Sequence, residues 1–166
     1  MPASDLYEPK LGFLSGRIIH HIELHSEQLA DGLLLRVEGC ARLGQFRERV
    51  PAEDLRQHAY EVYRHLGEWL LTRSESEVEH RYVEYGERRA RQGVPLSQLV
   101  LAMFATKEHL WQHITDEVFI DHALDIFQVL ELSRSLEKFF DRAVHFTTIG
   151  YERYRPEQHR ATAGKF

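Results

Sequence analysis

Residues 87–99 read Glu87-Arg88-Arg89-Ala90-Arg91-Gln92-Gly93-Val94-Pro95-Leu96-Ser97-Gln98-Leu99, a charged segment followed by a glycine, a proline and an apolar segment. Gly93 suits the left-handed position that ends many helices, and the arginines before it lie where the helix dipole favours cations. Pro95 suits the first turn of a second helix. This stretch therefore predicts a tight corner between two helices, with Gly93 at positive φ.

Apolar residues recur at helical spacing on both sides of this corner. The spacing predicts an all-α bundle of about five main helices, at residues 11–37, 51–71, 74–93, 96–114 and 119–154, with long first and last helices. Ser74 is the expected N-cap of the third helix, and residues 39–50 form either a connection or a short helix. The stripe of the last helix changes phase near Glu131, which predicts a bend or a second partner surface there.

Length and composition indicate a single soluble domain. The chain has 166 residues and a formal charge of −5, with both signs interspersed along the expected helices. We expect one domain over residues 1–155 and a polar tail over 156–166. The lone Cys40, the missing signal-peptide pattern and the short apolar runs favour a cytoplasmic protein with no nucleic-acid partner and no membrane span.

The eleven histidines raise the question of a metal or haem site. His21 and His25 are four residues apart, as are His109 and His113, so each pair could share one helix face. The HExxH pattern is absent and Glu-x-x-His occurs only at residues 77–80, so no metal site is expected. Helical winding places His109 and His113 opposite the apolar face, where solvent or a subunit contact is expected.

His25 differs from these because it lies within the apolar stripe of the first helix. A histidine hydrogen-bonded within the core is the simpler interpretation. The alternative is an axial haem ligand, which would make haem the cofactor.

Three charged residues interrupt otherwise apolar stripes: Arg89, Lys107 and Glu131. Their stems could cover the edge of the core while the charged heads stay in water. If instead the three converge, they form either a buried ion network or a binding pocket for an acidic signal molecule, because an isolated buried charge is costly.

No catalytic motif is found in the chain. The Gly-x-Ser-x-Gly elbow and the glycine-rich phosphate loop are absent, and Cys40 lacks the context of a nucleophile, so we expect a non-enzyme. A large aromatic set at helical spacing is expected in the core: Trp69, Phe104, Trp111, Phe127, Phe139, Phe140 and Phe146. The phase shift near Glu131 leaves the last helix with two apolar surfaces, more than one core needs, and Phe139, Phe140 and Phe146 are too large to stay exposed as a group. Together these features predict a two-fold dimer.

The run from Pro51 to about Asp116 resembles the N-terminal sensor domain of RsbR-type stressosome proteins. The Gly93-Val94-Pro95-Leu96 corner is its most specific part, with Asp54-Leu55 opening a helix and Leu110-Trp111 further on. The resemblance implies a globin-like helical fold, usually without haem, that dimerises and passes a signal to an attached output domain. The family's C-terminal domain with phosphorylatable threonines is missing from this sequence, so we expect a stand-alone module or an excised one.

These observations together predict a cytoplasmic bacterial signalling domain that forms a homodimer and relays a signal through contacts with an output domain or regulatory protein. The alternative is a globin-like sensor that binds haem or another small ligand.

Overall fold

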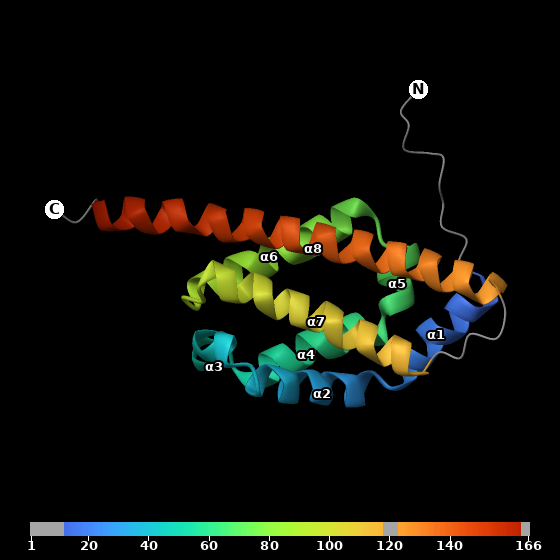
Figure 1. Ribbon diagram of the computed structural model, residues 1–166. Coiled ribbons are helices and arrows are strands. Elements are labelled where there is room, and N and C mark those ends of the chain that lie inside the picture. Colours follow the sequence, from blue (N-terminus) through green and yellow to red (C-terminus); the bar gives the residue numbers. More distant parts are fainter. Residues whose placement is uncertain (1–11, 118–122, 164–166) are drawn as a thin grey trace, which may run out of the picture.

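The computed structural model describes residues 12–117 and 123–163, and the side chains as far as residue 154. All regular structure in this part of the chain is helical (Figure 1). The elements are α1 (Phe13–Leu24), α2 (Ser26–Glu38), a short 3-10 helix η1 (Ala41–Leu43), α3 (Gly44–Arg49), α4 (Ala52–Arg64), α5 (Leu66–Leu71), α6 (Glu75–Arg91), α7 (Leu96–Glu117) and α8 (Ala123–Ala163). The all-α class is confirmed, whereas the count of about five main helices is not, because the described residues form eight α-helices of which two have only six residues.

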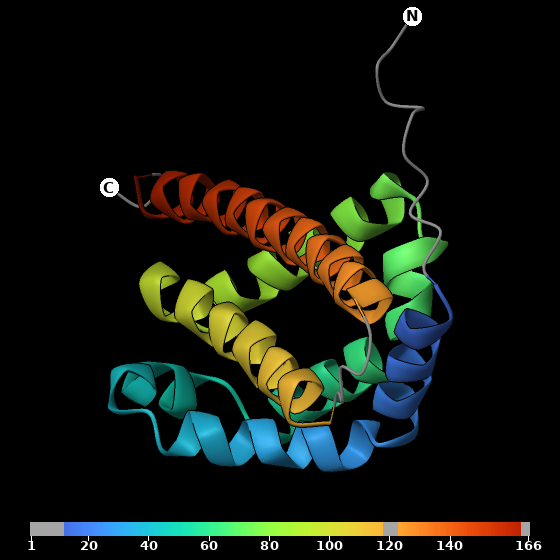
Figure 2. The same ribbon diagram turned by 45° about the vertical axis from the view of Figure 1, so that its right-hand side comes forward.

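Two of the expected helices are each divided by a histidine. His25 separates α1 from α2, and His65 separates α4 from α5, each with φ and ψ outside the helical region. Both breaks are invisible in the apolar periodicity, because the helices on either side bury side chains in the same core. Figure 2 shows the result, with α1 turned sharply away from α2.

The corner at Gly93 forms as expected. Gly93 has φ of 73°, and within the described residues no other residue has a positive φ. Its amide donates to the Ala90 carbonyl at 3.0 Å, and the Val94 amide donates to the Arg89 carbonyl at 3.2 Å, which together make a Schellman motif. Val94 is fully buried and α7 begins at once after Pro95. Ser74 is the N-cap of α6, in a capping box with Glu77.

The packing of α6 against α8 dominates the fold (Figure 1). Two glycines allow the helix backbones to touch: a Cβ on Gly86 would lie 2.0 Å from the Thr147 carbonyl oxygen, and one on Gly150 would lie 2.0 Å from that of Val83. Just beyond the crossing, the Tyr151 hydroxyl donates to the Val94 carbonyl at 2.7 Å. The opposite side of the molecule is formed by α2, which packs on α4 and α7.

The last helix differs from its prediction in several ways. A bend or a second partner surface was expected near Glu131. α8 runs through Glu131 as one uninterrupted helix, and the second partner surface stays a prediction. It continues to Ala163, and its far end projects beyond the other helices (Figure 1). Phe139, Phe140 and Phe146 are buried within a single chain and need no partner, whereas Leu124, Phe127 and Leu130 of the other apolar surface are exposed. The dimer stays a prediction.

Two further aromatic residues were placed wrongly by their spacing. Phe104 is 45% exposed and Phe127 is 66% exposed, although both were expected in the core. Their spacing placed them on the apolar side of each helix. The part of α7 and of α8 that contacts the core is narrower than this apolar side, so residues at its margin are exposed. Trp69 and Trp111 are partly buried and pack against the core from its edge.

Candidate functional site

Arg89 is a buried cation at the C-terminal end of α6. Its side chain is 1% exposed, and its guanidinium lies 4.7 Å from the centre of the Tyr85 ring. Nη1 donates to the Gln92 amide oxygen at 2.7 Å and lies 3.8 Å from the Asp54 carboxylate. Nε is buried without a hydrogen-bond partner among the described residues. The expectation that its charged head reaches water is therefore wrong for Arg89.

A polar groove lies between α4–α5 and α6, on the other side of Tyr85 from the interior. Its first part has a volume of about 290 Å³ and is lined by Asp54, Gln57, His58, Glu61, Arg81, Tyr85 and Arg88. A second part of about 610 Å³ shares Glu61 and Arg81 with the first and reaches Trp69. We call the two adjoining parts together the α4–α6 groove.

The charges that line the α4–α6 groove balance in number, but they are not all closely paired. Arg81 pairs with Glu61 at 2.5 Å, whereas the guanidinium of Arg88 is 3.6 Å from Glu84. His58 stacks on Tyr85 with the ring centres 4.3 Å apart. Burial, followed by the positive charges of the nearby arginines, lowers the pKa of His58 from 6.5 to about 3. His58 is therefore a neutral imidazole at physiological pH, close to three arginines that disfavour its protonation.

Lys107 and Glu131 are not part of this groove. Lys107 forms an ion pair of 3.1 Å with Glu137 on α8 and lies 5.6 Å from the centre of the Phe104 ring. Glu131 lies on α8 and is partly buried. The ion-pair partners of Arg89 and Lys107 lie on different helices, Asp54 on α4 and Glu137 on α8, so the contacts described for these two cations do not bring them into one cluster. A ligand-binding role for the three residues stays a prediction.

His25 lies at the junction between α1 and α2 and is partly buried. Its Nδ1 donates to the His21 carbonyl at 2.8 Å, which leaves Nε2 as the nitrogen that a haem iron would need. Its role as a haem ligand stays a prediction. Reconstitution with haemin checks it, because a Soret band that disappears in His25→Ala would support it and an absent band would contradict it.

The two histidines of α7 were expected to face solvent or a subunit, and this is wrong. His109 Nε2 donates to the Leu29 carbonyl at 3.0 Å, and the ring of His113 stacks on that of His21. Winding of a single helix could not reveal this packing, because α1 and α2 cover the side of α7 that its own apolar stripe leaves free. Within the described residues, no group of acidic, histidine or cysteine side chains is arranged to hold a metal ion.

An exposed apolar surface lies near the beginning of α8. We call it the α8 apolar face, and its members are Leu124, Ile126, Phe127 and Leu130, exposed by 67%, 47%, 66% and 54%. At about 100° per residue, Ile126, Phe127 and Leu130 lie on the side of α8 opposite Leu132, Leu136 and Phe139, which face the core, and Leu124 lies at the edge of that side. No described helix is both long and apolar enough to cross a membrane.

One comparison with known proteins gives a match. Residues 26–164 match the family described as RsbT co-antagonist protein rsbRD N-terminal domain, which is well over half of the chain. The chain belongs to this family. The rsbRD N-terminal domain is a regulatory domain of stressosome-type signalling, which confirms the resemblance carried by the Gly93 corner. No curated protein and no solved structure gave a match.

Sequence reasoning missed most of the α4–α6 groove of this rsbRD N-terminal domain. Asp54 was noted only as the start of a helix, and His58, Glu61, Arg81 and Arg88 were not singled out. The available signal was a polar stripe on each of two helices: Asp54, Gln57, His58 and Glu61 on α4, and Arg81, Tyr85 and Arg88 on α6. Such stripes are typical of any solvated helix face. They form a groove only because α4 and α6 lie side by side with their polar faces toward each other, which the sequence does not show.

Proposed function

We propose that this rsbRD N-terminal domain is a non-catalytic cytoplasmic module that forms a homodimer and relays a signal to an output domain or regulatory protein through protein contacts. The observation that carries the proposal is the α8 apolar face. Four large apolar side chains on one helical segment, each about half exposed or more, form the kind of surface that proteins use to bind one another.

A second copy of the chain is the partner that we propose for this face. An isologous contact brings the same patch of both chains together about a two-fold axis, which needs no complementary surface elsewhere on the molecule. The far end of the same helix projects beyond the body, so a change in the dimer contact is carried along α8 toward whatever follows it (Figure 1). We further propose that the helical arrangement is globin-like.

Light scattering coupled to size exclusion tests the dimer at tens of micromolar protein. We expect the parent chain to elute with twice the mass of one chain. Phe127→Lys and Leu130→Lys should give a monomer, because each places a charge in the apolar contact. Leu35→Lys is the matched control, since Leu35 is also an exposed leucine, 69% exposed, but lies on α2. A monomeric parent protein would contradict the proposal.

The α4–α6 groove supports a second candidate function, binding of a small acidic signal molecule. The specific observation is the incomplete pairing of two cations there: Arg88 is 3.6 Å from Glu84, and the buried Arg89, which lies over the Tyr85 ring, has an Nε without a hydrogen-bond partner among the described residues. An acidic ligand would bind Arg88 and Arg81 at the surface and gain long-range attraction from Arg89, which is poorly screened because it is buried.

Thermal unfolding with a panel of small carboxylates and phosphate tests this binding. A bound acid should raise the unfolding temperature, and the rise should grow with the logarithm of its concentration above the dissociation constant. The rise should be smaller in Arg88→Gln and unchanged in Arg91→Gln, because Arg91 is also on α6 but pairs with Glu87 outside the groove. If Arg88→Gln and Arg91→Gln respond alike, the groove is not the binding site.

A further inference from the structure

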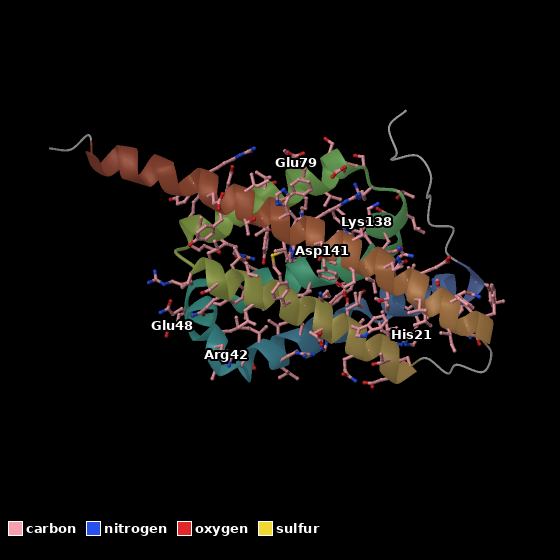
Figure 3. The ribbon with its side chains drawn as sticks, turned by 45° about the horizontal axis from the view of Figure 1, so that its top comes forward. His21, Arg42, Glu48, Glu79, Lys138 and Asp141 are labelled. Carbon is pink, nitrogen blue, oxygen red and sulfur yellow. The ribbon has the colours of Figure 1, made fainter. Side chains whose placement is uncertain are left out.

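Three imidazole rings meet where α1, α2 and α7 come together. The ring centres of His21 and His25 are 4.2 Å apart, and those of His21 and His113 are 5.4 Å apart with only 9° between the ring planes. Figure 3 shows His21 at this end of the molecule, beside the C-terminal end of α7 and far from Arg42 and Glu48 at the other end. These rings come from separate elements, so their contact holds the elements together.

The α7 side of this contact is built for neutral rings. Nε2 of His113 is buried without a hydrogen-bond partner among the described residues. One turn earlier, the ring of His109 packs so closely on α2 that a Cβ on Gly32 would lie 3.0 Å from it. Burial lowers the pKa of both His109 and His113, and the neighbouring His21 lowers that of His113 further. Both histidines therefore favour the uncharged form in the folded protein.

His25 makes this contact a joint in the chain as well. Its backbone ends α1 with φ of −104° and ψ of 19°, and its amide and its ring Nδ1 both bond the His21 carbonyl. The same histidine thus fixes the angle between α1 and α2 and stacks in the imidazole cluster. A change in the cluster acts directly on that angle.

We propose that His21, His25, His109 and His113, the histidine corner, form an acid-sensitive joint that holds α7 against α1 and α2 when the rings are neutral and releases it when they are protonated. Protonation of His113 would place a cation against the ring of His21, and protonation of His109 would add a second one turn earlier on α7. Such close like charges repel strongly where water is partly excluded.

The surrounding charges do not cancel this repulsion. On α7, Glu117 lies 3.8 Å from His21 and Asp116 acts on His113, but the Glu117 side chain is 55% exposed, so its attraction is screened by water. On α2, Arg36 is a cation that adds to the repulsion at His109. The lowered pKa values mean that the unfolded or opened chain binds more protons than the closed corner below about pH 6.5, so acid favours opening.

The corner is connected to the start of α8 through α1. The Leu14 amide donates to the Gln128 side chain at 2.7 Å, and the Ser15 hydroxyl donates to the Gln128 carbonyl at 3.0 Å. Gln128 lies between Phe127 and Leu130 of the α8 apolar face. We infer that opening of the corner alters the dimer contact, and this part of the inference rests on the proposed function. The opening itself does not depend on the proposed function.

Hydrogen exchange of the full chain tests the opening. Protection factors, corrected for the pH dependence of intrinsic exchange, are compared at about pH 7.5 and about pH 5.5, on either side of the ordinary histidine pKa. We expect the last two turns of α7 and the α1–α2 junction to lose protection by about tenfold or more at the lower pH. Protection of α6 at its crossing with α8 should stay unchanged.

Variants assign the effect to the corner. His113→Phe keeps an aromatic ring without a titrating group, so the loss of protection at low pH should shrink; His21→Gln serves if His113→Phe does not fold. His20→Phe is the matched control, because His20 is an exposed neighbour on α1. Equal protection at both pH values, or a loss that both corner variants leave intact, would overturn the proposal.

The same measurement on Phe127→Lys separates this proposal from the dimer. Opening that persists in the monomeric variant supports the acid-sensitive joint independently of dimerisation. Opening that occurs only in the dimer overturns the joint as a property of the single chain. A dimer that never forms contradicts the proposed function alone.

Discussion

At the scale of single residues, glycine and histidine determine what this domain can do. Gly86 and Gly150 allow two helix backbones to touch, and Gly93 allows α6 to end and α7 to begin within a few residues. His25 and His65 divide helices that the apolar pattern joins. The glycines allow close backbone contact or a positive φ because they have no Cβ. The two histidines lie where one helix ends and the next begins.

Gly86→Ala should be strongly destabilising. A Cβ there would overlap the Thr147 carbonyl oxygen, and backbone of a neighbouring helix cannot move aside as a side chain can. We expect a loss of about 2–4 kcal/mol in the free energy of unfolding, as for other overpacked cores. Chemical denaturation measures it.

Gly16→Ala is the control for Gly86→Ala. Gly16 is also helical, in α1, but a Cβ there meets nothing within 4 Å. Alanine should therefore stabilise the protein by up to about 1 kcal/mol through its helix propensity. Similar losses in both variants would show that α6 and α8 do not touch at Gly86.

Gly93→Val should cost about 1 kcal/mol or more. Its φ of 73° is strained for any residue with a Cβ, and more so for a β-branched one. Denaturation by urea measures the loss. Gly93→Asn should be milder, because asparagine tolerates the left-handed region, and a Val variant as stable as the parent would contradict the corner.

His58 should stay neutral across the physiological range. The structure lowers its pKa from 6.5 to about 3, so its ring carbon resonance should not titrate between about pH 8 and about pH 5. The folded protein binds fewer protons here than the unfolded chain, so stability falls as pH drops from about 6.5 toward 3. Part of that loss should disappear in His58→Phe. A midpoint near pH 6 for His58 would contradict its packing against Tyr85.

At the scale of helices, much of the fold follows from local signals. The corner at Gly93, the N-cap at Ser74 and the start of α7 after Pro95 were all predictable, because each rests on chemistry within a few residues. The breaks at His25 and His65 were not predictable, since periodicity continues through them. The glycine crossing of α6 and α8 was missed because it joins residues about 65 positions apart.

The candidate site was predictable only in part. Arg89 stood out because a charge on an apolar stripe is rare, and it is buried. Lys107 and Glu131 also interrupt apolar stripes, yet Lys107 pairs with Glu137 and not with a group near Arg89. A stripe shows which side of a helix a residue lies on, but it does not show which neighbouring helix covers that side. The phase change near Glu131 pointed to a second partner surface on the last helix, although Phe127, a member of the α8 apolar face, was expected in the core.

The separation of Arg89 from Lys107 predicts additive stability effects. Arg89→Met leaves Asp54, which is 44% exposed and can be solvated, and Lys107→Met leaves the exposed Glu137. The double variant should therefore lose the sum of the single losses to within about 0.5 kcal/mol, by chemical denaturation. A larger coupling energy would instead indicate that Arg89 and Lys107 belong to one ion network, as the sequence suggested.

At the scale of the whole molecule, the bundle has two ends with different characters. The histidine corner and the α8 apolar face lie at one end, and the α6–α7 corner and η1–α3 lie at the other (Figures 1 and 3). α8 runs past both, and its C-terminal part projects beyond the second end. The proposed regulatory contacts therefore lie at one end of α8 and its free arm at the other.

Cysteine cross-linking tests the two-fold arrangement. A residue near a two-fold axis faces its own copy, so Phe127→Cys in a Cys40→Ser background should form a disulfide-linked dimer under mild oxidation. Asp141→Cys, exposed further along α8, is the control and should remain monomeric on a reducing-agent-free gel. Equal cross-linking of both variants would indicate random collision.

The glycine crossing gives α8 the properties of a lever. At Gly86 and Gly150 the backbones of α6 and α8 are in direct contact, with no side chain between them. The crossing can therefore serve as the pivot about which α8 tilts. From Gly150 to Ala163 the arm is roughly 20 Å long at 1.5 Å per residue. A tilt of about 5° at the pivot would move its tip by about 2 Å, so a small rearrangement at the short end becomes a displacement large enough to change a side-chain contact at the long one.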